Sequence, residues 1–108
     1  MIVSLLNGYP ATIGERRAYT FYGTGPASYS QTTGDPVTTP SMGMYLDTVF
    51  QAMSVSKTYE VRFYPASTGT SRAAWTAKWY VISTGAEVAN GVNLSAEKIQ
   101  FGAFGGEF

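Results

Sequence analysis

The clearest pattern in the chain is an alternation between two sets of side chains along residues 75–82. Trp, Ala, Trp and Val at the odd positions alternate with Thr, Lys, Tyr and Ile at the even positions. A period of two is typical of a β-strand with one buried side. The Ser83-Thr84-Gly85 stretch interrupts the pattern and residues 86–89 resume it, as in a turn closed by a glycine bulge. Residues 73–90 therefore predict a long strand, a tight turn and a short antiparallel return.

Three further runs, residues 17–22, 58–64 and 98–104, alternate in the same way. In the first run one face carries Arg17, Tyr19 and Phe21; the expected core side chains of the other two are Tyr59, Val61 and Phe63, then Ile99, Phe101 and Ala103. Residues 2–6 fit an opening strand.

Residues 44–50 are less clear, because they fit either a helical turn or a strand. The strand would place on one side Met44, Leu46, Thr48 and Phe50. The single other helical candidate, residues 94–98, fits a loop equally well. These runs give seven or eight short strands, separated by turns rich in Gly, Pro and Asn. They predict one all-β domain over residues 1–108, an antiparallel β-sandwich of jelly-roll type.

Residues 23–43 form the one long connection and are rich in Gly, Pro, Ser and Thr. A connection of this length in a compact domain is usually functional. It is either an arm that reaches a partner, by adding a strand or lying in a shared groove, or a surface loop.

The chain contains no histidine and no cysteine, which removes the commonest general base, the thiol nucleophile and the usual zinc ligands. No two of the seven acidic residues have a spacing that sets a pair of carboxylates across a cleft, and no nucleophile elbow, phosphate-binding loop or calcium loop is present. We therefore expect no enzyme, no catalytic residue, no metal site and no cofactor. A small hydrolase with two carboxylates remains a distant alternative.

Charge is sparse and balanced, with seven basic and seven acidic residues that make up 13% of the chain. A nucleic-acid-binding domain would carry a basic surplus, so we expect no nucleic-acid partner. No apolar run approaches the ~20 residues of a membrane span, and we expect neither a signal peptide nor a membrane segment. A surface poor in charge suits a protein covered by neighbours, since interface cores are depleted in charged residues.

Two readings of Trp75 and Trp79 are open, since they lie four residues apart on one face of the same predicted strand. Exposed, they would form a platform for stacking on sugar rings. Buried, with small Ala77 between them, they would interdigitate with a facing sheet. The alternation of large and small side chains favours the core.

Residues 28–36 (SYSQTTGDP) and 78–97 (KWYVISTGAEVANGVNLSAE) resemble stretches in small virion proteins of tailed bacteriophages. The resemblance covers about half the chain and carries no catalytic or ligand signature. It implies a capsid decoration, or cement, protein: a β-domain that clamps neighbouring coat subunits on the capsid exterior. The implied partners are the major capsid protein and copies of this chain.

We therefore expect a non-enzymatic structural virion protein that binds through residues 23–43 and through its two ends. The expected partner-binding residues are Tyr29, Gln31, Thr33, Asp35, Phe104 and Phe108. The alternative is a carbohydrate- or receptor-binding β-sandwich module that uses exposed aromatic side chains.

Overall fold

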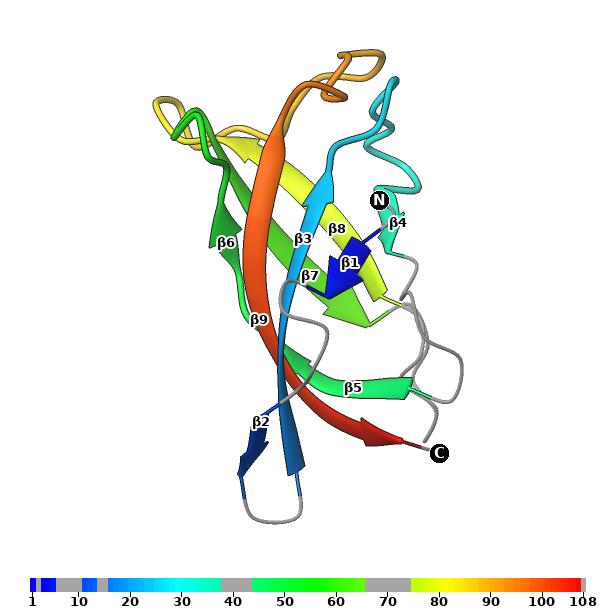
Figure 1. The fold of residues 1–108 in the computed structure, drawn as a ribbon. Helices are drawn as coiled ribbons and strands as arrows, with labels where there is room; N and C mark the ends of the chain where they lie inside the picture. Colours follow the sequence, from blue (N-terminus) through cyan, green and yellow to red (C-terminus); the bar gives the residue numbers. More distant parts are fainter. Residues whose placement is uncertain (2, 6–10, 14–15, 38–43, 66–74, 108) are drawn as a thin grey trace.

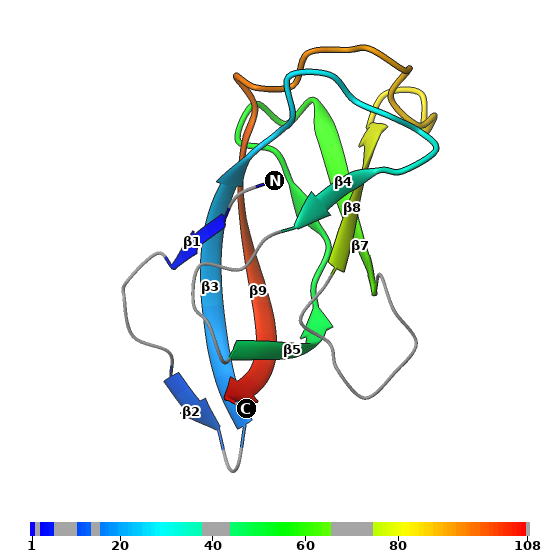
Figure 2. The same cartoon turned by 90° about the vertical axis from the view of Figure 1, so that its right-hand side faces the viewer.

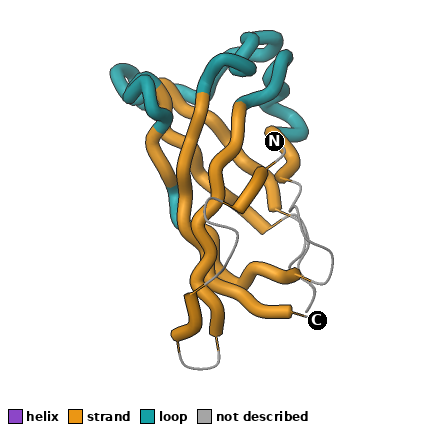
Figure 3. Tube along the Cα trace, in the orientation of Figure 1, coloured by secondary structure: helices purple, strands orange, loops and turns teal. Residues whose placement is uncertain are grey.

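The computed structural model describes residues 1, 3–5, 11–13, 16–37, 44–65 and 75–107, and these contain nine β-strands and no helix. The strands are β1 (Val3–Leu5), β2 (Ala11–Ile13), β3 (Arg16–Thr24), β4 (Asp35–Val37), β5 (Met44–Val49), β6 (Ala52–Met53), β7 (Tyr59–Pro65), β8 (Trp75–Val81) and β9 (Lys98–Glu107) (Figure 1). Most of the described loops gather at one end of the molecule (Figure 3). Within the described ranges, no helix has the length and hydropathy to cross a bilayer.

The strands form two antiparallel sheets that face each other (Figure 2). The first has the order β1-β3-β9-β5, with β2 also paired to β3, and the second has the order β4-β8-β7-β6. The long strands β3 and β9 pair from Arg17 opposite Gly105 to Thr24 opposite Lys98. The predicted all-β antiparallel fold is confirmed, and the helical candidate at residues 94–98 is a turn in which the Glu97 N–H donates to the Leu94 carbonyl.

Residues 44–55 connect the two sheets at one side. Strand β5 pairs with β9, and the Phe50 N–H still donates to the carbonyl of Gly102 in β9 at 3.0 Å. Two residues later β6 pairs with β7 of the other sheet, after which the Val55 N–H returns to the carbonyl of Lys98 at 2.8 Å. The two sheets therefore share a hydrogen-bonded edge along β9.

Residues 44–49 form a strand, as one of the two readings predicted, but the expected single face is wrong. The register against β9 shifts between Leu46 and Thr48, which breaks the period of two. Thr48 is exposed and Phe50 is 48% exposed, so neither belongs to the core. The side chains of Met44 and Leu46 lie outside the description.

The core lies between the two sheets and confirms the alternation read from the sequence. All the residues expected on the inner faces of β7 and β9 are buried or partly buried there, as are Tyr19 and Phe21 of β3. Phe101 of β9 joins the layers, because its ring centroid lies 5.3 Å from that of Phe21 and 4.5 Å from that of Phe63. Trp75 and Trp79 are both buried, which confirms their core assignment.

Residues 23–37, part of the expected arm, are folded onto the domain. Strand β3 continues to Thr24, and β4 pairs with β8 from Asp35 opposite Ala77 to Val37 opposite Trp75. Between them the backbone is held to residues 91–97; the hydrogen bonds are Gly25 N to Glu97 O, Leu94 N to Pro26 O, Tyr29 N to Val92 O and Gly91 N to Tyr29 O. Residues 23–37 therefore pack on the domain as the surface-loop reading describes, and residues 38–43 lie outside the described residues.

The turn into β4 depends on Gly34, which has φ of +68°. A Cβ at this position would lie 2.5 Å from Thr76 Cγ2 and 3.1 Å from the Ala77 carbonyl oxygen. Gly91 also has a positive φ, of +85°, but a Cβ there would meet nothing within 4 Å. Substitutions at the two glycines therefore distinguish the cost of a left-handed backbone from the cost of steric overlap.

We expect Gly34→Ala to lower the free energy of unfolding by about 2–4 kcal/mol, because strain and overpacking add. The control, Gly91→Ala, should cost about 1 kcal/mol, from the left-handed backbone alone. Urea unfolding of both variants measures the difference. Equal losses would show that Gly34 does not pack against Thr76 as described.

Candidate functional site

A polar network around Trp79 contains two of the residues that we expected to bind a partner. The indole Nε1–H of Trp79 donates to Asp35 Oδ2 at 3.2 Å, and its backbone N–H donates to the Tyr29 hydroxyl at 3.1 Å. The Tyr29 hydroxyl in turn donates to Glu87 Oε2 at 2.7 Å. Asp35 also accepts from the Met1 ammonium group. The network fixes residues 29–35 to the centre of β8.

Tyr29 and Asp35 are 1% and 2% exposed, so their side chains have no free surface on which a partner could bind. Their side chains hold this chain together instead. Burial raises the pKa of Tyr29 above its ordinary value of 10.0; the Trp79 N–H opposes this shift and Glu87 reinforces it. The phenol therefore stays neutral well into the alkaline range.

Gln31 and Thr33 are exposed on the same loop. The Gln31 backbone N–H donates to Asn90 Oδ1 at 2.7 Å and its side-chain Nε2 donates to the Val88 carbonyl at 2.9 Å. The Thr33 N–H donates to Ser30 Oγ at 3.3 Å. These two residues keep accessible surface, and their predicted role in binding stays a prediction.

Phe104 lies on β9, whose C-terminal half points to the other end of the molecule from the loop of residues 25–34 (Figure 1). Its ring meets that of Phe50 edge to face, with centroids 5.5 Å apart. Phe108 lies outside the described residues. Of the five expected residues that the structure describes, Tyr29, Gln31, Thr33 and Asp35 share one segment and Phe104 lies apart from them.

The outer side of the first sheet forms a surface that we call the neutral face. Strand pairing and exposure place on it Ser4, Ala18, Thr20, Tyr22, Thr48, Phe50, Gln100, Gly102 and Phe104. Lys98, at the end near Thr24, is the only charged side chain among those described on this side. Phe50 and Tyr22 are 48% and 47% exposed. The described residues of this surface therefore offer mainly hydroxyl and aromatic groups and little charge.

The neutral face was not identified from the sequence, although part of its signal was present. The outward positions of residues 18–22 read Ala, Thr and Tyr, and those of residues 100–104 read Gln, Gly and Phe. Phe50 reaches this face only because of the register shift in β5. It packs over Gly102, where an added Cβ would lie 3.6 Å from its ring.

The outer side of the second sheet, which we call the charged face, has different chemistry. Cross-strand pairs between β7 and β8 place Glu60 opposite Tyr80, Arg62 opposite Lys78, and Tyr64 opposite Thr76. Arg62 Nε lies 3.3 Å from Glu60 Oε1, and its guanidinium carbon lies 4.2 Å from the centre of the Tyr80 ring. Partial burial and a hydrogen bond with Tyr64 raise the pKa of Tyr80.

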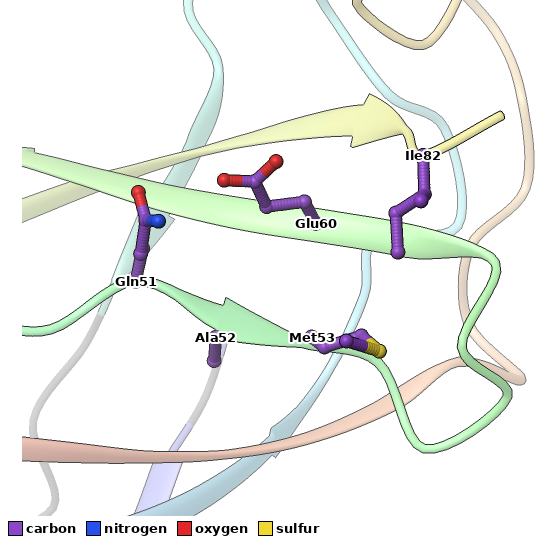
Figure 4. Close-up of a pocket in the computed structure, with 5 residues that line it drawn as sticks. All are labelled: Gln51, Ala52, Met53, Glu60 and Ile82. Carbon is purple, nitrogen blue, oxygen red and sulfur yellow. The ribbon is translucent and has the colours of Figure 1, made fainter. Parts of the chain in front are cut away.

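An open hollow of about 270 Å³ adjoins the charged face, between β6 and the end of β8 (Figure 4). Its lining combines apolar and polar groups: Gln51, Ala52, Met53, Glu60 and Ile82. Met53 and Ile82 are exposed and lie on either side of β7.

Four carboxylates of the described residues already accept hydrogen bonds from other side chains. They are Asp35, Glu60, Glu87 and Glu97. The described part of the chain holds no cluster of three or more groups able to ligate a metal ion.

Comparisons with protein-family models, with curated proteins and with solved structures find no match.

The Tyr29 hydroxyl can be tested by Tyr29→Phe, which keeps the ring and leaves the buried Trp79 N–H without its acceptor. We expect a loss of about 1–3 kcal/mol in the free energy of unfolding at pH 7. The control is Tyr22→Phe on the exposed side of β3, where we expect a change within about 0.5 kcal/mol.

The same variant predicts a pH dependence. Because the folded pKa of Tyr29 lies above the unfolded one, its contribution is complete below about pH 10 and is lost as the pH rises further. Wild type should therefore lose more stability than Tyr29→Phe between about pH 9 and pH 11, as measured by urea unfolding. Parallel losses in the two proteins would contradict the buried, hydrogen-bonded phenol.

Proposed function

We propose that this chain is a non-enzymatic structural protein that docks on a protein partner through the neutral face. The observation that carries the proposal is the scarcity of charge among the described residues of that face, together with the exposed rings of Tyr22 and Phe50. Interface cores are depleted in charged residues and enriched in aromatic ones. Burying this surface would remove apolar area from water without stripping charges of their solvent.

An aromatic pair covers part of the neutral face. Gly102 lies opposite Thr20, and the Phe50 ring packs over Gly102 and meets Phe104 edge to face. A partner side chain can therefore seat against the edge-to-face aromatic pair.

The sequence resemblance supplies the identity of the partner in this proposal. The chain would be a capsid decoration protein on the exterior of a tailed phage virion, bound to neighbouring subunits of the major capsid protein or to further copies of itself. Its fold would be a β-sandwich of jelly-roll type. Repeated sites on a capsid lattice would let modest individual contacts hold a small domain firmly. The contact surface moves from residues 23–37, which are used within the domain, to the neutral face.

The alternative, a carbohydrate- or receptor-binding module, loses its tryptophan platform because Trp75 and Trp79 are buried. One observation on the charged face still favours a binding module of this class: Tyr64 is 43% exposed beside charged and hydroxyl groups.

Thr20→Lys tests the docking surface, since it places a charge in the middle of the neutral face. We expect the variant to fold and to bind purified virions at least tenfold more weakly than wild type. Docking would bury the new charge without a partner, which costs more than ~1.4 kcal/mol of binding free energy. The control is Ser83→Lys, which adds the same charge on the exposed turn after β8 and should bind normally.

Co-sedimentation with density-purified particles measures both variants, and quantitative mass spectrometry gives the copy number of the natural protein. A ratio near one per coat subunit supports decoration, whereas a few copies would indicate a tail or connector position. Absence from particles overturns the virion role, and normal binding by Thr20→Lys overturns the neutral face as the contact.

A further inference from the structure

The charged face places two cations side by side. Arg62 and Lys78 are directly paired across β7 and β8, and like charges at such positions repel each other. Glu60 neutralises one of them through its contacts of 3.3 and 3.5 Å with Arg62. Lys78 is half-buried, and no ion pair to it is found among the described residues. Glu87, beside Tyr80, is engaged by the Tyr29 hydroxyl.

The Arg62 guanidinium is fixed in place but not saturated. Its stacking on the Tyr80 ring, its two contacts with Glu60 and its hydrogen bond with Tyr64 hold its plane, while a guanidinium carries five N–H donors. The remaining donors, together with the Lys78 ammonium, suit a carboxylate. The hydroxyls of Tyr64, Tyr80 and Thr76, on the same face, can donate or accept further hydrogen bonds.

The hollow continues this surface on the β6 side. Glu60 contributes to both, because it contacts Arg62 and also lines the hollow. In Figure 4 the Glu60 carboxylate lies over β7, with Gln51 on one side and Met53 and Ile82 on the other. The walls therefore offer apolar contact and polar acceptors within one space that has room for a sugar ring.

We propose that the charged face binds an acidic saccharide. Its carboxylate lies between Arg62 and Lys78, and the adjoining ring occupies the hollow between Met53 and Ile82. A sugar places hydroxyl donors next to its carboxylate, and the oxygens of Glu60 and Gln51 can accept further hydrogen bonds from them. An acidic peptide segment fits less well, because a second carboxylate at the hollow would face Glu60. This site is on the opposite sheet from the neutral face and does not depend on the docking proposal.

The test uses the whole chain on a panel of uronate- and sialate-terminated oligosaccharides, each paired with its uncharged methyl ester. We expect at least one acidic glycan to bind and its ester to bind at least tenfold more weakly. Isothermal titration of that acidic glycan with Lys78→Gln should show an affinity at least tenfold lower than that of wild type. The matched control, Lys98→Gln, removes the same charge on the side of the neutral face and should bind as wild type.

Three outcomes overturn the proposal. Binding of no acidic glycan on the panel excludes the ligand class. Equal weakening by Lys78→Gln and Lys98→Gln shows attraction to net charge alone. Binding of an Asp/Glu-rich peptide at the Lys78-dependent site, without any glycan, assigns the face to an acidic protein segment. None of these outcomes affects the virion experiment, so the two proposals fail separately.

Discussion

The indole of Trp79 imposes the requirement on which much of the structure depends. A ring of this size fills the space between the sheets, but a buried N–H without an acceptor is costly. Asp35 supplies the acceptor, and it can do so only because β4 pairs beside β8 and Gly34 makes the preceding turn. Tyr29 meets the Trp79 backbone N–H from the same segment. One buried residue, through its indole and its backbone N–H, thus holds both ends of residues 29–35.

The sequence predicted those parts of the fold in which a single strand contains its own signal. The inner side chains of β7, β8 and β9 follow from a period of two, and so does the burial of both tryptophans. The packing of residues 23–37 did not follow, because Gly, Pro, Ser and Thr indicate a loop but not the surface that it covers. Tyr29 and Asp35 looked like exposed contact residues, since their partners Glu87 and Trp79 lie on distant segments. The neutral face could not be predicted from the sequence either, because Phe50 joins it only through a register shift in β5.

The two outer faces differ in chemistry although their strands alternate in the same way. On the first sheet the outward residues are hydroxyl, amide, glycine and aromatic groups, whereas the second sheet pairs Glu60, Arg62, Lys78 and two tyrosines. Residues 44–55 join the sheets, so a ligand on one face and a partner on the other would be held in a fixed relative orientation. A protein attached through its neutral face would therefore present its charged face outward.

The pairing of β3 with β9 also governs when the chain can fold. β9 forms the hydrogen-bonded partner of β3, of β5 and of the residue that follows β6, although it is made last among the described strands. During synthesis, β3 must wait with its inner aromatic side chains unpaired until residues 98–107 have left the ribosome. Contacts between distant segments slow folding and expose unpaired strand edges to aggregation. The edge of β3 that β9 will cover is therefore open to other chains until synthesis is nearly complete.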